Sequence, residues 1–199
     1  MLLFGVTGGI GSGKTVVCNF LREKDIPIIE ADPLAKELTN HSPEIRRALV
    51  TEFGKDVYLD SGTVNKDLLS QLVFNDAGTR ERINQIIHPQ VFKAIQGRVN
   101  QFKKENHQLV GVEAALIYES QMERILNAVV VVTAPMEKRI EWIKSRDGFS
   151  QEEILKRMNS QIPLEEKIKR ADYVIDNEGS LSDLAKKVAA FYHWLFSKI

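Results

Sequence analysis

Short runs of consecutive apolar residues alternate along this chain with stretches in which apolar residues recur every three or four positions. The first pattern is typical of buried parallel strands, and the second of helices that cover a sheet. The runs predict five strands, at residues 2–6, 26–32, 109–113, 128–133 and 171–177. Because helical stretches separate most of these strands, the pattern predicts an α/β fold built on a parallel sheet.

Helical patterning continues without a convincing strand from residue 65 to residue 104, which predicts a helical insertion. Within it His88 precedes Pro89, and a residue before proline is biased away from helical geometry, so we expect a break between two helices there. A second helical stretch, rich in charge, covers residues 136–170. Ser180, with an aspartate three positions later, resembles a capping box and predicts the start of a final helix.

A glycine-rich segment follows the first predicted strand and matches the phosphate-binding pattern G-x-x-x-x-G-K-[ST] at every specified position. Its residues are Gly8, Gly9, Ile10, Gly11, Ser12, Gly13, Lys14 and Thr15. Glycine lets backbone N–H groups approach the phosphates of a nucleotide, and the next helix directs its positive dipole end at them. Lys14 is expected to contact the β- and γ-phosphates, and the Thr15 hydroxyl to bind Mg²⁺. The segment therefore predicts a nucleoside triphosphate site, and a turn without a ligand is the weaker alternative.

Composition narrows the possible partners. The chain has 199 residues, and its 27 basic and 27 acidic residues give a formal net charge of zero, so no global field attracts nucleic acid or an anionic membrane. The single cysteine, Cys18, excludes an internal disulfide, and its position after the glycine loop favours packing over reactivity. No signal peptide or long apolar run is visible. We therefore expect a cytoplasmic protein without a nucleic-acid or membrane partner.

Two carboxylates, Asp32 and Glu113, end predicted strands, and ligands of an open parallel sheet bind at the carboxyl ends of its strands. Asp32 is a candidate general base or Mg²⁺-organising group, and a helix N-cap before Pro33 is a compatible alternative. Glu113 could support Mg²⁺, directly or through water, or form a salt bridge at the strand end. Glu119 could line the same cleft or face solvent, and the sequence does not decide between these positions.

Arg139 and Arg146 are seven residues apart, so they can lie on one face of a helix and reach over the phosphates. Such arginines stabilise the transferring phosphoryl group, an effect of roughly 1,000-fold or more in rate. The alternative is that they are solvated, as most arginines of a charged helix are. Arg157 and Gln161 have weaker claims of the same kind. For His88, a structural turn is the default and a ligand contact the alternative.

Taken together, these features resemble those of the dephospho-CoA kinase family, and the resemblance covers nearly the full length of the chain. Residues 5–15 are similar to the family's G-L-T-G-G-I-G-S-G-K-S, and Ala31-Asp32 is similar to its A-D pair. Further similar segments are Asn65-Lys66, Leu72-Val73-Phe74, Ile87-His88-Pro89, Leu116-Ile117-Tyr118-Glu119, residues 139–146 with Arg157 and Gln161, and residues 171–177. The combination is more specific than the glycine loop alone.

The resemblance implies a P-loop NTPase fold of the nucleoside-monophosphate-kinase-like type, with a parallel-sheet core, a helical substrate-binding insertion and a helical lid. We expect the core in residues 1–58, 108–135 and 171–199, the CoA-binding insertion in residues 59–107, and the lid in residues 136–170. The expected assembly is a monomer or a small homo-oligomer.

The same resemblance implies transfer of the γ-phosphoryl group of ATP to the ribose 3′-hydroxyl of dephospho-CoA, the last step of coenzyme A synthesis, with Mg²⁺ as cofactor. Asp32 would act as the base, Arg139 and Arg146 would close over the transfer, and Asn177 would lie near the adenine of ATP. The implied substrate-binding residues are Asp32, Lys66, His88 and Glu113. The family usually has aspartate where this chain has Glu113, which leaves a metal-supporting role for Glu113 open.

Two other functions remain compatible with the residues. One is a kinase of the same fold that acts on a nucleoside monophosphate or on a sugar-like alcohol. The other is a nucleotide-switch protein that hydrolyses slowly and signals by binding a partner. Asn65-Lys66-Asp67 superficially resembles the guanine-reading motif N-K-x-D, but the aspartate comes one position early and no strand end precedes it, which argues against a GTPase.

Overall fold

The computed structural model describes the backbone of residues 1–199 and the side chains of all except Val73, Phe74, Asn75 and Ala77. The similarity at Val73 and Phe74 therefore falls outside the described side chains. The chain forms two compact units. The first comprises Met1–Glu30 and Val99–Ile199, and the second comprises Ala31–Arg98.

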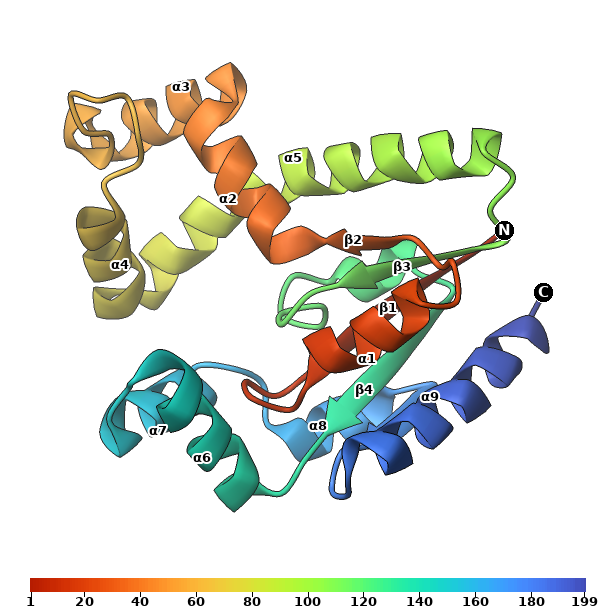
Figure 1. Ribbon diagram of the computed structural model, residues 1–199. Helices are drawn as coiled ribbons and strands as arrows, with labels where there is room; N and C mark the ends of the chain where they lie inside the picture. The colour runs from red at the N-terminus through yellow and green to blue at the C-terminus, as the bar shows by residue number, and fades with distance from the viewer. The chain divides into compact units, whose positions relative to one another are not determined.

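A five-stranded parallel sheet forms the centre of the first unit (Figure 1). The strands are β1 (Leu2–Gly8), β2 (Ile28–Glu30), β3 (Leu109–Glu113), β4 (Ala128–Thr133) and β5 (Tyr173–Asp176). Their order is β2-β3-β1-β4-β5, and every neighbouring pair is parallel. The parallel α/β core predicted from the apolar runs is confirmed, and β3 and β4 have the predicted bounds.

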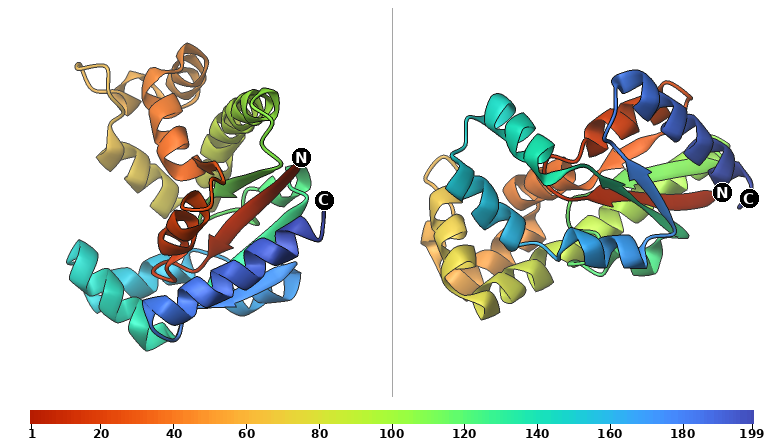
Figure 2. Two further views of the ribbon diagram at one scale, coloured as in Figure 1. Left: turned by 45° about the vertical axis from the view of Figure 1, so that its right-hand side comes forward. Right: turned by 90° about the horizontal axis from the view of Figure 1, so that it is seen from below.

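Helices α1 (Lys14–Arg22) and α9 (Leu181–Phe196) contact each other and cover one face of the sheet (Figure 2). Successive side chains of a strand point to opposite faces. Accordingly, Leu2, Phe4 and Val6 of β1 share a buried cluster with apolar residues of both helices. Burial of this apolar surface, at about 25 cal/mol per Å², is the main stabilising contribution to the first unit.

The first unit contains further helical segments that belong to its carboxyl-terminal half. They are η2 (Met122–Ile125), α6 (Met136–Asp147), α7 (Gln151–Asn159) and α8 (Leu164–Arg170). Ser180 and Asp183 form the predicted capping box at the start of α9, where each side chain accepts a hydrogen bond from the other residue's backbone N–H. Within the described part of the chain, no helix has the length and apolar content needed to cross a membrane.

The second unit consists of helices. They are α2 (Ala31–His41), α3 (Pro43–Phe53), η1 (Lys55–Val57), α4 (Lys66–Asn75) and most of α5 (Ala77–Lys104). The sequence predicts a helical insertion over residues 59–107, whereas the compact unit already begins at Ala31. The reason is packing, because Ile45 and Leu49 of α3 share a buried cluster with Ile83 of α5.

The predicted helix break at His88 and Pro89 is wrong at the level of secondary structure. Helix α5 is continuous from Ala77 to Lys104 with Pro89 inside it. Proline removes one backbone donor and bends a helix without necessarily ending it. Figure 1 shows the axis of α5 changing direction along its length. Ile83 and Val91, on either side of the proline, are buried and stabilise the helical turns that flank it.

The predicted second strand is shorter than expected at its carboxyl end. Strand β2 ends at Glu30 and α2 begins at Ala31, so Asp32 lies in the first turn of α2. It is therefore neither a strand end nor the N-cap. The fixed φ of Pro33 and its missing N–H suit a first helical turn, and an acidic side chain there interacts favourably with the helix dipole.

Candidate active site

The glycine-rich segment joins the carboxyl end of β1 to the start of α1. Its backbone conformation requires glycine at specific points. A Cβ atom at Gly8 would lie 2.1 Å from the carbonyl oxygen of Val132. Gly13 has φ of 92° and is the N-cap of α1. Side chains at these positions would strain the turn that directs backbone N–H groups toward a phosphate.

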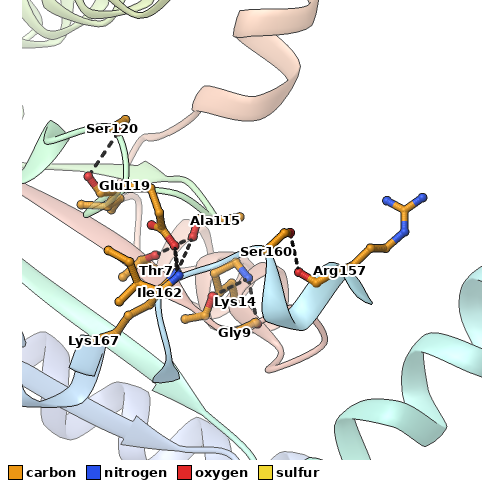
Figure 3. A network of polar contacts seen from close by, with 12 residues as sticks. Thr7, Gly9, Lys14, Ala115, Glu119, Ser120, Arg157, Ser160, Ile162 and Lys167 are labelled. Atoms are coloured by element: carbon orange, nitrogen blue, oxygen red, sulfur yellow. Dashed lines mark hydrogen bonds and ion pairs between the residues drawn. The ribbon is translucent and has the colours of Figure 1, made fainter. Parts of the chain in front are cut away.

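The side chain of Lys14, the first residue of α1, folds back onto this loop. Its Nζ donates hydrogen bonds to the carbonyl oxygens of Gly9, at 3.2 Å, and Gly8, at 3.4 Å (Figure 3). These oxygens are neutral acceptors, and an anionic phosphate would form a stronger, charge-assisted bond with the same ammonium group. The ammonium group of Lys14 is thus held within the glycine-rich segment.

Arg139 of α6 packs against the loop. Its side chain is buried, and its Nε donates a hydrogen bond of 2.9 Å to the carbonyl oxygen of Ile10. A Cβ atom at Gly9 would lie only 2.4 Å from Nη2 of Arg139, so glycine makes room for the guanidinium. Burial lowers the pKa of Arg139, and the charge of Glu165 opposes that shift. Because an arginine stays protonated in proteins, the loop has a fixed positive charge beside it.

Arg146 occupies a different environment at the end of the same helix. Its side chain is 66% exposed, and its Nε and Nη2 donate to the two carboxylate oxygens of Asp147, each at 2.8 Å. This bidentate hydrogen bonding raises the pKa of Arg146. The structure thus brings Arg139 onto the loop, whereas Arg146 is paired with a neighbouring carboxylate.

A pocket of about 350 Å³ lies beside the loop, with Gly11 and Gly13 in its wall. It is lined by Gly11, Gly13, Val16, Trp142, Ile143, Arg146, Asn177, Gly179, Leu181 and Leu184. The lining is mainly apolar and includes one aromatic ring. A flat heterocycle attached to phosphates bound by the loop could be accommodated in such a site.

Asn177 links this pocket to the loop. It follows β5, is buried, and its Nδ2 donates a hydrogen bond of 3.0 Å to the carbonyl oxygen of Ser12. Its backbone N–H donates to the carbonyl oxygen of Thr133 at 2.7 Å. Asn177 therefore holds the loop against the ends of β4 and β5, in addition to lining the pocket.

Thr15 of α1 and Glu113 meet at the carboxyl end of β3. The Thr15 hydroxyl donates a hydrogen bond of 2.8 Å to Oε1 of Glu113, the last residue of β3. The longer side chain of glutamate thus reaches the loop threonine. Beneath them Cys18 is buried, and burial, reinforced by the charge of Glu113, raises the pKa of its thiol. A protonated, buried thiol is a packing group and a poor nucleophile.

Hydroxyl and carboxylate oxygens are the donors that Mg²⁺ prefers, and Mg²⁺ usually takes only one or two of them from a protein. Among the residues with described side chains, no group of three or more His, Cys, Asp or Glu residues could hold a metal ion. The pair of Thr15 and Glu113 therefore fits a Mg²⁺ that is held largely by nucleotide phosphates and water.

Three residues predicted to bind the substrate, Asp32, Lys66 and His88, belong to the second unit, whereas the glycine loop belongs to the first. Asp32 and Lys66 are exposed residues in the first turns of α2 and α4. His88 is half-buried in α5 and stacks on Phe92 with ring centroids 6.1 Å apart. Burial lowers the pKa of His88, so its neutral form is favoured. These three residues share one helical unit without being neighbours in the sequence.

Arg157 of α7, another arginine predicted for the site, contacts an aromatic ring. Its guanidinium stacks on the ring of Phe149, 4.4 Å from the centroid, and Figure 3 shows its side chain extending away from Lys14. Lys167 of α8 is almost completely buried, although it was not among the residues predicted for the site. No local signal identifies it, because a lysine in a charged helix normally faces solvent.

The parallel sheet, the glycine loop at the end of β1 and the arginine over that loop define a P-loop kinase with a nucleoside-monophosphate-kinase-like α/β fold. The family model described as dephospho-CoA kinase matches residues 2–183. The chain belongs to the dephospho-CoA kinase family, as the sequence resemblance predicted.

Similar proteins agree with this assignment. A dephospho-CoA kinase of Salinibacter ruber is 41% identical over 192 residues, which cover 96% of each chain. A solved structure from Thermus thermophilus has a TM-score of 0.83 at 32% identity and covers 98% of this chain and 97% of its own. The solved dephospho-CoA kinase of Campylobacter jejuni has a TM-score of 0.70 at 26% identity, covering 97% of this chain and 96% of that one.

Proposed function

We propose that this protein transfers the γ-phosphoryl group of ATP to the ribose 3′-hydroxyl of dephospho-CoA and releases CoA and ADP. The observation that carries the proposal is membership of the dephospho-CoA kinase family over residues 2–183, which include a complete phosphate-binding loop. In the transfer, the 3′-oxygen forms a bond to the γ-phosphorus while the bond from that phosphorus to the β,γ-bridging oxygen breaks. The hydroxyl proton passes to the carboxylate of Asp32.

The phosphates of ATP would bind to the loop from Gly8 to Thr15. Lys14 would exchange its bonds to the carbonyl oxygens of Gly8 and Gly9 for bonds to phosphate oxygens. Arg139 would stabilise the charge that develops on the transferring group, since its guanidinium lies against Gly9. The adenine would occupy the pocket lined by Trp142 and Asn177.

Thr15 and Glu113 would hold Mg²⁺ together with the phosphates, Thr15 as a ligand and Glu113 directly or through water. The ion, when bound, supplies neutralisation of the phosphate charge. Glu113 orients the Thr15 hydroxyl through their hydrogen bond of 2.8 Å. The change from aspartate to glutamate is thus compatible with a metal-supporting role.

The second unit would bind dephospho-CoA through Asp32, Lys66 and His88. Asp32 would orient and deprotonate the acceptor hydroxyl. Residues 136–170, which form α6, α7 and α8, would act as a lid that excludes water during the transfer. Exclusion of water matters because hydrolysis of ATP competes with transfer to the acceptor.

The first test is product identification. The purified protein is incubated with Mg²⁺ and ATP and with dephospho-CoA, AMP or no acceptor, and the products are identified by mass spectrometry. We expect CoA and ADP in equal amounts with dephospho-CoA, and little ADP otherwise. Phosphorylation of AMP would instead indicate a nucleoside monophosphate kinase, and equal ADP without an acceptor would indicate a nucleotide hydrolase.

Glu113→Gln is expected to raise the Mg²⁺ concentration for half-maximal activity by about 10-fold, because the neutral amide supports the metal less well. Activity is measured as a function of free Mg²⁺ at saturating ATP and dephospho-CoA. Glu30→Gln is the matched control, since Glu30 ends β2 in register with Glu113 but pairs with Arg22. An unchanged Mg²⁺ dependence in Glu113→Gln would remove Glu113 from the metal site.

A further inference from the structure

Lys167 is a buried cation outside the glycine loop. Only 1% of its side chain is exposed. Its Nζ donates hydrogen bonds to Oε1 of Glu119 at 2.8 Å and to the carbonyl oxygen of Ala115 at 3.0 Å. Because a buried charge is tolerated only with well-placed partners, these contacts hold α8 in one position against the segment that follows β3.

Glu119 connects the same cation to the end of the helical region. Its Oε1 also accepts a hydrogen bond of 2.9 Å from the backbone N–H of Ile162, which lies between α7 and α8 (Figure 3). The Glu119 side chain is only 19% exposed. One carboxylate oxygen therefore binds both Lys167, in the middle of α8, and the segment that leads into that helix.

The other side of this network reaches the phosphate site. The carbonyl oxygen of Ala115 accepts a hydrogen bond of 3.2 Å from the hydroxyl of Thr7. Thr7 directly precedes the first glycine of the loop. Ala115 lies two residues after Glu113, whose carboxylate accepts the hydrogen bond from Thr15. The network therefore joins α8 to both segments that form the phosphate site, β1 and the end of β3 (Figure 3).

We infer that Lys167 and Glu119 are positioning residues that fix the carboxyl-terminal attachment of the lid, residues 136–170, to the phosphate site. The inference rests on the proposed kinase function and on the proposed lid. A lid that closes repeatedly into one geometry needs fixed ends. The amino-terminal end begins in α6, where Arg139 bonds to Ile10, and the carboxyl-terminal end is held by Lys167 and Glu119.

The burial of this pair is what makes it suitable as an anchor. Exposed ion pairs exchange partners with water and constrain geometry weakly. A buried lysine that loses its carboxylate has no such replacement. Loosening the anchor lets the lid occupy more conformations, which lowers the population of its closed state. The closed state is the one that keeps water away from ATP during the transfer.

Glu119→Gln and Lys167→Met test the anchor. We expect kcat for CoA formation to fall by about 10-fold in each variant, as for a tenfold smaller closed population. KM for ATP should stay near that of the wild type, because neither residue contacts the nucleotide in the proposed site. The ratio of ADP to CoA produced should rise above one, because hydrolysis escapes the loosened lid. This ratio does not depend on how much of the variant is folded.

Lys169→Met is the matched control. Lys169 lies on the same helix, but it is 69% exposed and pairs with Glu166 at the surface, so its removal should leave kcat and the product ratio unchanged. The double variant Lys167→Met/Glu119→Gln removes both charges, avoids an isolated buried charge, and should keep the raised ratio if Lys167→Met alone folds poorly.

The outcomes separate the inference from the proposed function. A wild-type protein that forms no CoA from dephospho-CoA would overturn both. A wild-type protein that forms CoA, together with variants that keep its kcat and its one-to-one product ratio while their melting temperatures fall, would overturn only the anchor. A raised product ratio in Glu119→Gln and in the double variant, with a normal ratio in Lys169→Met, would support it.

Discussion

Arg139→Lys is expected to lower kcat by about 1,000-fold, because the guanidinium beside the loop is the group best placed to stabilise the transferring phosphoryl. Lysine keeps the charge but loses the planar fork. In the present structure Nε of Arg139 bonds to Ile10, and Nη2 lies against the position of Gly9. A single ammonium is a compact point charge, so it cannot occupy the position of Nε beside Ile10 and the position of Nη2 beside Gly9 at the same time, whereas the guanidinium spans both. The measurement is steady-state CoA formation at saturating substrates.

Two comparisons make the Arg139 result specific. Arg124→Lys, at an exposed arginine of η2 in the same unit, should retain wild-type kcat. Arg146→Lys should have a smaller effect than Arg139→Lys, since Arg146 is exposed and bound to Asp147. A folded Arg139→Lys variant with near-normal turnover would assign Arg139 to stabilisation of the loop alone, and an Arg146→Lys variant with the larger loss would reverse the roles of the two arginines.

Asp32→Asn is expected to lower kcat by roughly 100- to 10,000-fold, the range typical for loss of a general base. The amide has nearly the same shape as the carboxylate, so binding of dephospho-CoA should weaken much less than turnover. Single-turnover phosphoryl transfer, measured together with the Kd for dephospho-CoA, separates the two effects. If the affinity for dephospho-CoA fell and the single-turnover rate of transfer did not, Asp32 would be a substrate-binding residue only.

Asp67→Asn is the matched control for Asp32. Both aspartates are exposed and lie in the first turn of a helix in the second unit, Asp32 in α2 and Asp67 in α4. Each substitution therefore removes a similar favourable interaction with a helix dipole, typically about 0.3–1 kcal/mol. A comparable fall in stability in both variants, with a fall in kcat confined to Asp32→Asn, would isolate the chemical role from the structural one.

Much of the fold could be predicted because it depends on short-range patterns. Continuous apolar runs marked β3 and β4 with the observed bounds, and Ser180 with Asp183 marked the start of α9. The same reasoning was wrong at Pro89, where α5 continues through the proline. It also extended β2 too far, because Asp32 and Pro33 suit the first turn of a helix as well as a strand end.

In the candidate site, the sequence located some residues and could not distinguish others. The spacing of glycines with Lys14 and Thr15 was sufficient to locate the phosphate loop, since that motif is continuous in the chain. Arg139 and Arg146 had equal claims from spacing, yet only Arg139 lies against the loop. Glu113 and Thr15 are 98 positions apart, and their hydrogen bond exists because β1 and β3 are neighbours in the sheet.

The local sequence was thus enough for the existence of the five strands, for the glycine loop and for the capping box at Ser180, since each depends on residues within a few positions of one another. The tertiary structure decided which charged groups became buried and which segments met. Lys167 resembles any other lysine of a charged helix, and it is buried because α8 packs beside Ala115 and Glu119. A charge takes its environment from neighbours that the fold brings from distant parts of the chain, and no local pattern of residues contains that information.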